Sequence, residues 1–243
     1  MNRIKLGPLA TMSPASRTEF DFESRAARPR STTSDHSVFI PLHYEKNYAY
    51  PLVVWLHDRG SNEAQLADIM SVLSLRNYVA VAPRGPSACG GGGFDWSQTA
   101  SSIENSDQSI AAAIDDSRQQ FNIASQRIFL AGIGTGGTMA FRIALQRPEW
   151  FGGVLSINGS LPAGSTPLVR LNACRRLPIF WTHCRADDRF SESELAMQLR
   201  VLHIGGFQVT LRQYPSGNQR NQILPDANRW MMDLITRPAT TAS

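Results

Sequence analysis

The chain has 243 residues, of which 42% are hydrophobic and 18% are charged, and its formal net charge is +4 at pH 7. This length and apolar content suit one α/β domain with a single large core. The positive residues are scattered arginines rather than a cluster, which argues against nucleic acid as a partner. No apolar run reaches the roughly 18 residues that a membrane-spanning helix needs.

Residues 1–35 are rich in serine, threonine, arginine and proline, which predicts a flexible N-terminal arm. The arm lacks the apolar region of a signal peptide, so we expect a cytoplasmic protein. Residues 36–237 are expected to form a single domain, and residues 238–243 a disordered tail. The three cysteines show no metal-ligand spacing with the histidines, so we expect free thiols and neither a metal nor another cofactor.

Short apolar runs alternate with segments of helical periodicity along the domain. The runs predict strands at residues 38–42, 52–57, 78–82, 127–131, 153–157, 179–183 and 208–213. The periodic segments predict helices at residues 66–73, 110–121, 136–146, 192–203 and 224–235. Such alternation is typical of a mostly parallel, twisted sheet, here of about seven or eight strands, with helices on both faces. Functional side chains should then gather at the carboxyl ends of the strands.

A tight glycine turn joins the fourth predicted strand to the next helix, in the sequence Gly132-Ile133-Gly134-Thr135-Gly136. A sharp corner of this kind holds its apex residue in strained φ/ψ space, and flanking glycines let neighbouring backbone pass close by. The pattern G-x-S-x-G places a nucleophilic serine at such an apex. The apex here is Gly134, so the frame is present without its hydroxyl group.

Other loops that follow strands are expected at the same edge of the sheet. One begins at His57, and another leads through a run of glycines to Phe94 and Trp96. We interpret His57, Phe94 and Trp96 as the lining of a crevice. The alternative is that the two large rings simply pack on the outer core.

With these motifs in this order, the chain resembles the phospholipase/carboxylesterase and dienelactone-hydrolase-like group of α/β-hydrolases. The similarity covers about residues 37–236, and its matching segments are the loop 57–63, Pro83-Arg84-Gly85, 129–148, 153–156, 183–187 and Tyr214-Pro215-Ser216-Gly217. The resemblance implies an α/β-hydrolase fold with a serine nucleophile, an acid and a histidine in that chain order.

Carried over residue by residue, the resemblance gives an incomplete catalytic set. The serine falls on Gly134, the acid on Asp187, which is kept, and the histidine on Asn218. The oxyanion-hole region falls on three residues, Asp58, Arg59 and Thr135, with Asp58 in place of a glycine. A carboxylate there opposes oxyanion stabilisation unless a cation such as Arg59 compensates it.

Several replacements for the missing groups can be weighed from the sequence. Thr135 adjoins the apex, but no imidazole is evident to activate it. Cys184 follows His183, yet adjacent strand residues project to opposite sides. His203, the only histidine after Asp187, belongs to a helix, where a triad base is not expected. A further arrangement brings together the carboxylates of Asp58, Asp187 and Asp188 near His57, although their spacing matches no recognised metal motif.

Three functions are consistent with this pattern. The first is an α/β-hydrolase homologue that has lost serine-hydrolase catalysis and binds a ligand, such as a small ester or acyl compound, or a partner protein. The second is an active ester hydrolase with relocated catalytic residues. The third is a structural or assembly protein. The sequence does not fix the oligomeric state.

Overall fold

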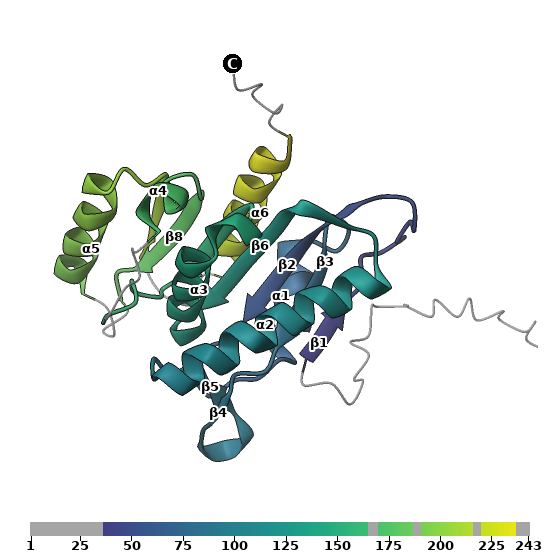
Figure 1. The fold of residues 1–243 in the computed structure, drawn as a ribbon, viewed down its shortest axis with the longest axis horizontal. Coiled ribbons are helices and arrows are strands. Elements are labelled where there is room, and N and C mark those ends of the chain that lie inside the picture. Colours follow the sequence, from purple (N-terminus) through teal and green to yellow (C-terminus); the bar gives the residue numbers. More distant parts are fainter. Residues whose placement is uncertain (1–35, 165–169, 187–190, 216–219, 237–243) are drawn as a thin grey trace, which may run out of the picture.

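A computed structural model of the protein describes residues 36–164, 170–186, 191–215 and 220–236 (Figure 1). The N-terminal arm and the C-terminal tail that the sequence predicts lie outside these ranges. Asp187, Asp188 and Asn218 lie outside them as well. The roles that the resemblance assigns to Asp187 and Asn218 stay predictions.

A seven-stranded sheet runs through the centre of the molecule, in the order β1-β3-β2-β6-β7-β8-β9. Its strands are β1 (His36–Phe39), β2 (Tyr50–Leu56), β3 (Val79–Pro83), β6 (Ile123–Ile133), β7 (Gly153–Ile157), β8 (Ile179–Cys184) and β9 (Val209–Tyr214). β1 pairs antiparallel with β3, and the other neighbouring strands pair in parallel. The predicted mostly parallel sheet is confirmed, and each predicted strand overlaps one of these seven.

Helices cover both faces of this sheet (Figure 1). One apolar cluster includes side chains of α2 (Ala100–Gln120), α3 (Thr135–Gln146) and α5 (Glu192–Ile204). The opposite cluster includes side chains of α1 (Gln65–Leu73) and α6 (Arg220–Thr236). Leu52 and Val53 of β2 belong to different clusters, because successive side chains point to opposite faces of a strand. Every residue of β2 is therefore buried, which explains its continuous apolar run.

Some short elements have no signal in the sequence periodicity. The glycine-rich loop after β3 contains a hairpin of β4 (Ser87–Ala88) and β5 (Phe94–Asp95) around a 3-10 turn at Gly90–Gly92. A second 3-10 turn, Pro148–Trp150, and the short α4 (Leu171–Cys174) are likewise too brief to show a repeat. None of the helices in the described ranges combines the length and hydropathy that crossing a bilayer requires.

The first turn of α5 is closed by a reciprocal pair of side-chain hydrogen bonds. The hydroxyl of Ser191 accepts the backbone N–H of Glu194 at 3.2 Å, and the carboxylate of Glu194 accepts the backbone N–H of Ser191 at 2.9 Å. We predict that Ser191→Ala lowers the free energy of unfolding by about 1 kcal/mol, because the backbone N–H of Glu194 loses its acceptor at the helix start. Chemical denaturation measures this loss. Ser193→Ala in the same turn is the control and should change stability little.

Candidate functional site

The turn between β6 and α3 has the backbone geometry of a strained corner. Gly134 adopts φ 56° and ψ −120°, its N–H donates to the carbonyl of Ile157 at 2.8 Å, and its own carbonyl accepts the N–H of Thr138 at 3.1 Å. A positive φ of this size is one that L side chains rarely adopt. Gly136 is needed for a different reason, because a Cβ there would overlap the backbone carbonyl oxygen of His57.

The carboxylate of Asp58 lies directly over Gly134. A Cβ placed on Gly134 would overlap Oδ1 of Asp58 and would lie 2.8 Å from its Cγ. The same Oδ1 accepts the backbone N–H of Arg59 at 2.8 Å. Residue 134 can therefore carry no side chain while Asp58 keeps this position.

His57 holds the base of this loop from inside the protein. Its side chain is fully buried, its Nε2 accepts the backbone N–H of Gly85 at 3.0 Å, and its Nδ1 lies 2.8 Å from the carbonyl oxygen of Asp58. Because Nε2 is the acceptor, the proton sits on Nδ1 and is donated to Asp58. Burial lowers the pKa of His57, although the neighbouring carbonyl and carboxylates act in the opposite direction. The imidazole is therefore neutral and joins the loops that follow β2 and β3.

Trp96 supports the same loop from a second side. Its ring is 1% exposed, and its Nε1 donates to the carbonyl oxygen of His57 at 3.0 Å. The prediction that His57 and Trp96 line an open crevice is wrong, because both rings are buried as supports of the backbone. Phe94 is partly exposed, and the guanidinium of Arg84 lies 4.9 Å from the centre of its ring.

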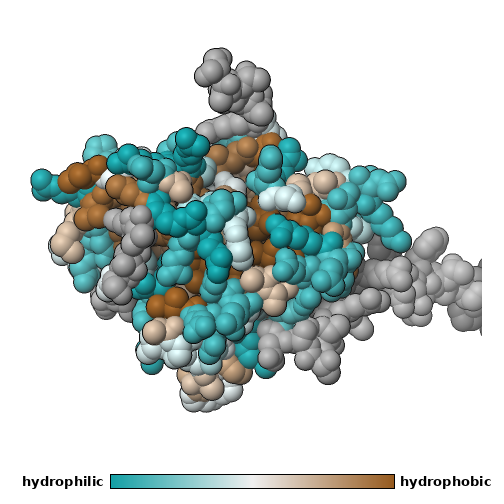
Figure 2. Space-filling view, viewed as in Figure 1, coloured by the Kyte–Doolittle hydropathy of each residue, from teal (hydrophilic) through white to brown (hydrophobic). Residues whose placement is uncertain are grey.

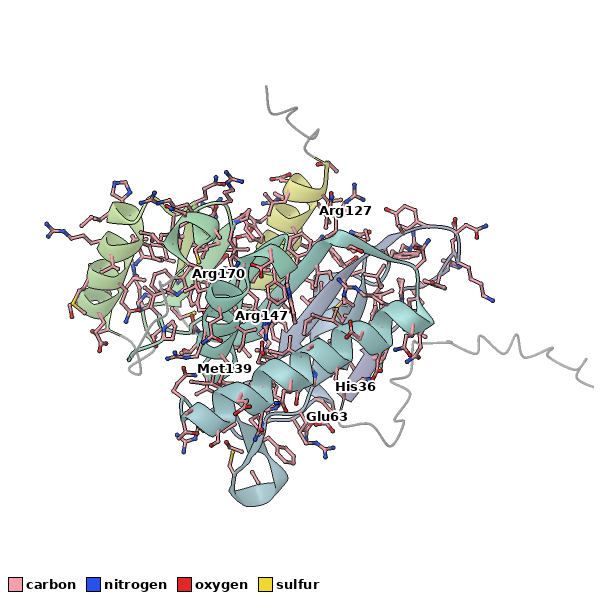
Figure 3. All side chains as sticks on the ribbon, viewed as in Figure 1. His36, Glu63, Arg127, Met139, Arg147 and Arg170 are labelled. Carbon is pink, nitrogen blue, oxygen red and sulfur yellow. The ribbon has the colours of Figure 1, made fainter. Side chains whose placement is uncertain are left out.

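An ion pair that the sequence did not reveal joins the loop after β2 to the loop after β3. Arg84 donates to both carboxylate oxygens of Glu63, at 2.9 and 2.5 Å, and these bonds lower the pKa of Glu63. Figure 3 labels Glu63 at the carboxyl-terminal end of the strands, whereas Arg127 lies at the opposite end. Neither residue belongs to a spacing motif, so only their meeting in space identifies the pair. Arg59 Nε lies 3.5 Å from Asp95 Oδ2. The side chain of Arg59 is 70% exposed, so this ion pair contributes little to stability.

Polar atoms without partners gather at the carboxyl ends of adjacent strands. In the part of the chain that the structure describes, Thr135 Oγ1, Asn158 Oδ1 and Thr182 Oγ1 are buried and make no hydrogen bond. Thr135 follows the end of β6, and Asn158 follows β7 with φ 53°. Thr182 lies within β8, two residues before the strand ends. Buried polar atoms normally have partners, so this edge of the sheet keeps hydrogen-bonding capacity that the described residues do not use.

The other reactive groups named from the sequence lie apart from this arrangement. His183 and Cys184 are both buried near the end of β8, and Cys184 belongs to the apolar cluster under α1 and α6. His203 is exposed in the last turn of α5. Among the described residues, no group of three or more histidine, cysteine, aspartate or glutamate side chains is arranged to hold a metal ion.

A comparison with protein families matches residues 43–227 to the phospholipase/carboxylesterase family. The chain belongs to this family. The α/β-hydrolase fold that the resemblance implies is thereby confirmed, and the seven-stranded sheet agrees with it.

The chain is also similar to curated relatives and to solved structures. The chain is 25% identical over 159 residues to a "Probable carboxylesterase" and 28% identical over 156 residues to a "Probable inactive carboxylesterase", both from Oryza sativa subsp. japonica. These two matches cover 57% and 55% of this chain, and 68% and 63% of the relatives themselves. A third match, to an esterase relative from Nocardia uniformis, covers 31% of this chain and 21% of that relative. SOBER1 of Arabidopsis thaliana has the same fold, with a TM-score of 0.63 and 20% identity over 77% of this chain and 100% of SOBER1.

The burial of His57 predicts a pH dependence of stability. An unfolded histidine takes up a proton near pH 6.5, whereas folded His57 resists protonation until the pH is lower. Acid therefore favours the unfolded state, so the contribution of His57 is complete above pH 6.5 and declines as the pH falls below it. His57→Leu should remove this part of the slope and cost about 1–3 kcal/mol, because the N–H of Gly85 loses its acceptor. Urea unfolding between neutral pH and mildly acidic pH measures both effects, with His203→Gln as the surface control.

Proposed function

We propose that this member of the phospholipase/carboxylesterase family has lost serine-hydrolase catalysis and acts as a binding protein for a small ester or acyl-type ligand or for a partner. The observation that carries the proposal is the contact between Asp58 and Gly134. In the family pattern, position 134 belongs to the serine. The carboxylate of Asp58 occupies the space that the Cβ of a serine would need, so a serine at position 134 requires the Asp58 side chain to move.

The charge of Asp58 works against the second requirement of ester hydrolysis. The resemblance assigns the oxyanion-hole donors to the region of Asp58, Arg59 and Thr135. The N–H of Arg59 already donates to Oδ1 of Asp58. A donor that is occupied by an internal carboxylate cannot receive the developing negative charge of a tetrahedral intermediate, and the carboxylate itself repels that charge.

The third requirement is a base, and the resemblance places asparagine at its position. The amide of Asn218 cannot accept a proton from a nucleophile, even with Asp187 kept as the acid. Removal of the serine or histidine of a triad lowers the turnover number by roughly a millionfold, and the members fail as a unit. We infer that ester hydrolysis by the family mechanism is negligible in this protein.

Binding remains chemically reasonable at the same edge of the sheet. Thr135, Asn158 and Thr182 each keep a buried polar atom without a partner in the described ranges. A threonine hydroxyl can donate to a carbonyl oxygen of a small polar ligand, and an amide oxygen can accept from a ligand hydroxyl. A relative in rice that bears the name "Probable inactive carboxylesterase" is consistent with loss of activity within this family.

One observation favours the alternative of an active hydrolase with relocated groups. Asp58 puts a carboxylate oxygen next to the apex of the turn, and a carboxylate can act as a nucleophile. If this alternative holds, turnover of short aryl esters by the natural protein should disappear in Asp58→Asn and persist in the exposed control Asp68→Asn. We expect instead that turnover by the natural protein does not exceed the background rate.

The proposal predicts how activity can be restored. Gly134→Ser with Asn218→His should stay inactive, because a side chain at position 134 collides with Asp58. Addition of Asp58→Gly should give measurable turnover of short aryl esters, at least about a hundredfold above that of the double variant, because the nucleophile and the oxyanion-hole donors then become available together. Steady-state kinetics measures the difference.

A covalent probe separates the possible outcomes of this restoration. A fluorophosphonate should label the triple variant and leave the natural protein unlabelled. Stoichiometric labelling of the natural protein near Gly134 would contradict the loss of catalysis. Failure of the triple variant, despite a melting temperature close to that of the natural protein, would contradict the inferred block by Asp58.

A further inference from the structure

One end of the molecule presents an edge strand and an exposed helix. β9 is the last strand in the sheet, and within the described ranges its ladder partner is β8. α5 leads into β9 through a short turn and forms the left-hand end of the molecule in Figure 1. Phe207, which lies between the two elements, is buried in the same apolar cluster as Leu202 of α5. The strand edge and the helix therefore belong to one continuous part of the surface.

The outer side of β9 carries backbone groups that no strand covers in the described part of the chain. The N–H of Ile179 donates to the carbonyl of Gln208 at 2.9 Å. The backbone N–H and C=O groups of the even-numbered residues in β9 therefore point towards β8. In a parallel ladder, the N–H and C=O of one residue point to the same side. The N–H and C=O of Val209, Leu211 and Gln213 therefore point outward. Six consecutive residues without proline make this edge suitable for pairing with another strand.

α5 exposes a row of apolar side chains on the side away from the core. Met197, Val201 and Ile204 are 63%, 45% and 74% exposed and follow each other at helical spacing. The inner face of the helix already buries Leu195 and Leu202. Figure 2 shows hydrophobic side chains at this end of the molecule. A helix that is apolar on both sides is typical of one that is covered on both sides.

The charges of α5 are separated along the helix. Glu192 and Glu194 lie in its first turn, and Arg200 and His203 lie towards its end. Two copies of this helix that pack antiparallel bring the acidic start of one against the basic end of the other. A twofold axis produces this arrangement, because it places the same patch on both subunits in opposite directions. The charge pattern thus fits a second copy of the same chain.

The edge strand has the same self-complementarity. Around a twofold axis at Leu211, each β9 runs antiparallel to its copy, and residue 209 stands opposite residue 213 of the other subunit. The outward N–H and C=O groups of Val209, Leu211 and Gln213 then face the equivalent groups of the second strand, as an antiparallel ladder requires.

We propose that two copies of this chain form a twofold dimer in which the β9 edges pair antiparallel and the exposed faces of the two α5 helices pack together. This interface lies outside the Gly134 turn and does not depend on whether the protein binds an ester or hydrolyses one. Met197 and Val201 form its apolar centre, Ile204 lies near the first turn of the partner helix, and its specificity comes from the strand edge and the helix charges.

Sedimentation of the full chain at micromolar concentration tests the proposal, and the natural protein should sediment as a dimer. Ile204→Glu should raise the dissociation constant at least about tenfold, because it places another carboxylate against the acidic first turn of the partner helix. Gln213→Pro should do the same through the backbone, because it removes an outward N–H and leaves the ladder with β8 intact. The matched controls are Leu75→Glu, on another exposed apolar residue, and Gln213→Ala, which keeps the N–H.

Arg200→Glu gives a third, independent test on the surface of α5. It removes the attraction between the helix ends, and it should weaken the dimer with little change in the melting temperature of the subunit. A natural protein that sediments as a monomer would overturn the proposal. A dimer that dissociates no more readily with Ile204→Glu, Gln213→Pro and Arg200→Glu would place the interface elsewhere and would overturn it as well.

Discussion

The contact between the Asp58 carboxylate and Gly134 joins the loop after β2 to the turn between β6 and α3, and the proposed loss of catalysis depends on it. The turn keeps the positive φ of a strained corner, but the space above it is filled from the loop after β2. Because two groups cannot occupy one volume, a side chain at 134 and the present position of Asp58 exclude each other. The same carboxylate takes the N–H of Arg59. One carboxylate thus contacts both the apex of the turn and the N–H of Arg59, and the proposed function rests on these two contacts.

The position of Asp58 depends in turn on buried polar contacts beneath its loop. His57 accepts from Gly85 and donates to the carbonyl of Asp58, and Trp96 donates to the carbonyl of His57. Each of these bonds is inside the protein, where an unpaired polar group is costly. These bonds fix the backbone from which the Asp58 side chain extends over the turn. The neutral state of His57 belongs to this arrangement, since a protonated ring could no longer accept from Gly85.

The sequence predicted the sheet, the helices and the turn, because each depends on local patterns. Continuous apolar runs marked strands buried on both faces, and three glycines marked a corner where backbones approach closely. The role of His57 and Trp96 was mistaken, since a ring on a loop can line a crevice or support a backbone with the same sequence. The pair of Glu63 and Arg84, and the partnerless atoms of Asn158 and Thr182, had no local signal at all.

The sequence by itself determined the fold class, the family resemblance and the absence of a hydroxyl group at position 134. The resemblance also places Asp58 where the family has a glycine, but only as one residue in a loop far from the turn in the chain. The tertiary structure decided that these two positions are one feature, because it brings a carboxylate from the loop after β2 onto the turn that follows β6. Distances between residues that are remote in sequence depend on the packing of the whole sheet, and no local pattern contains them.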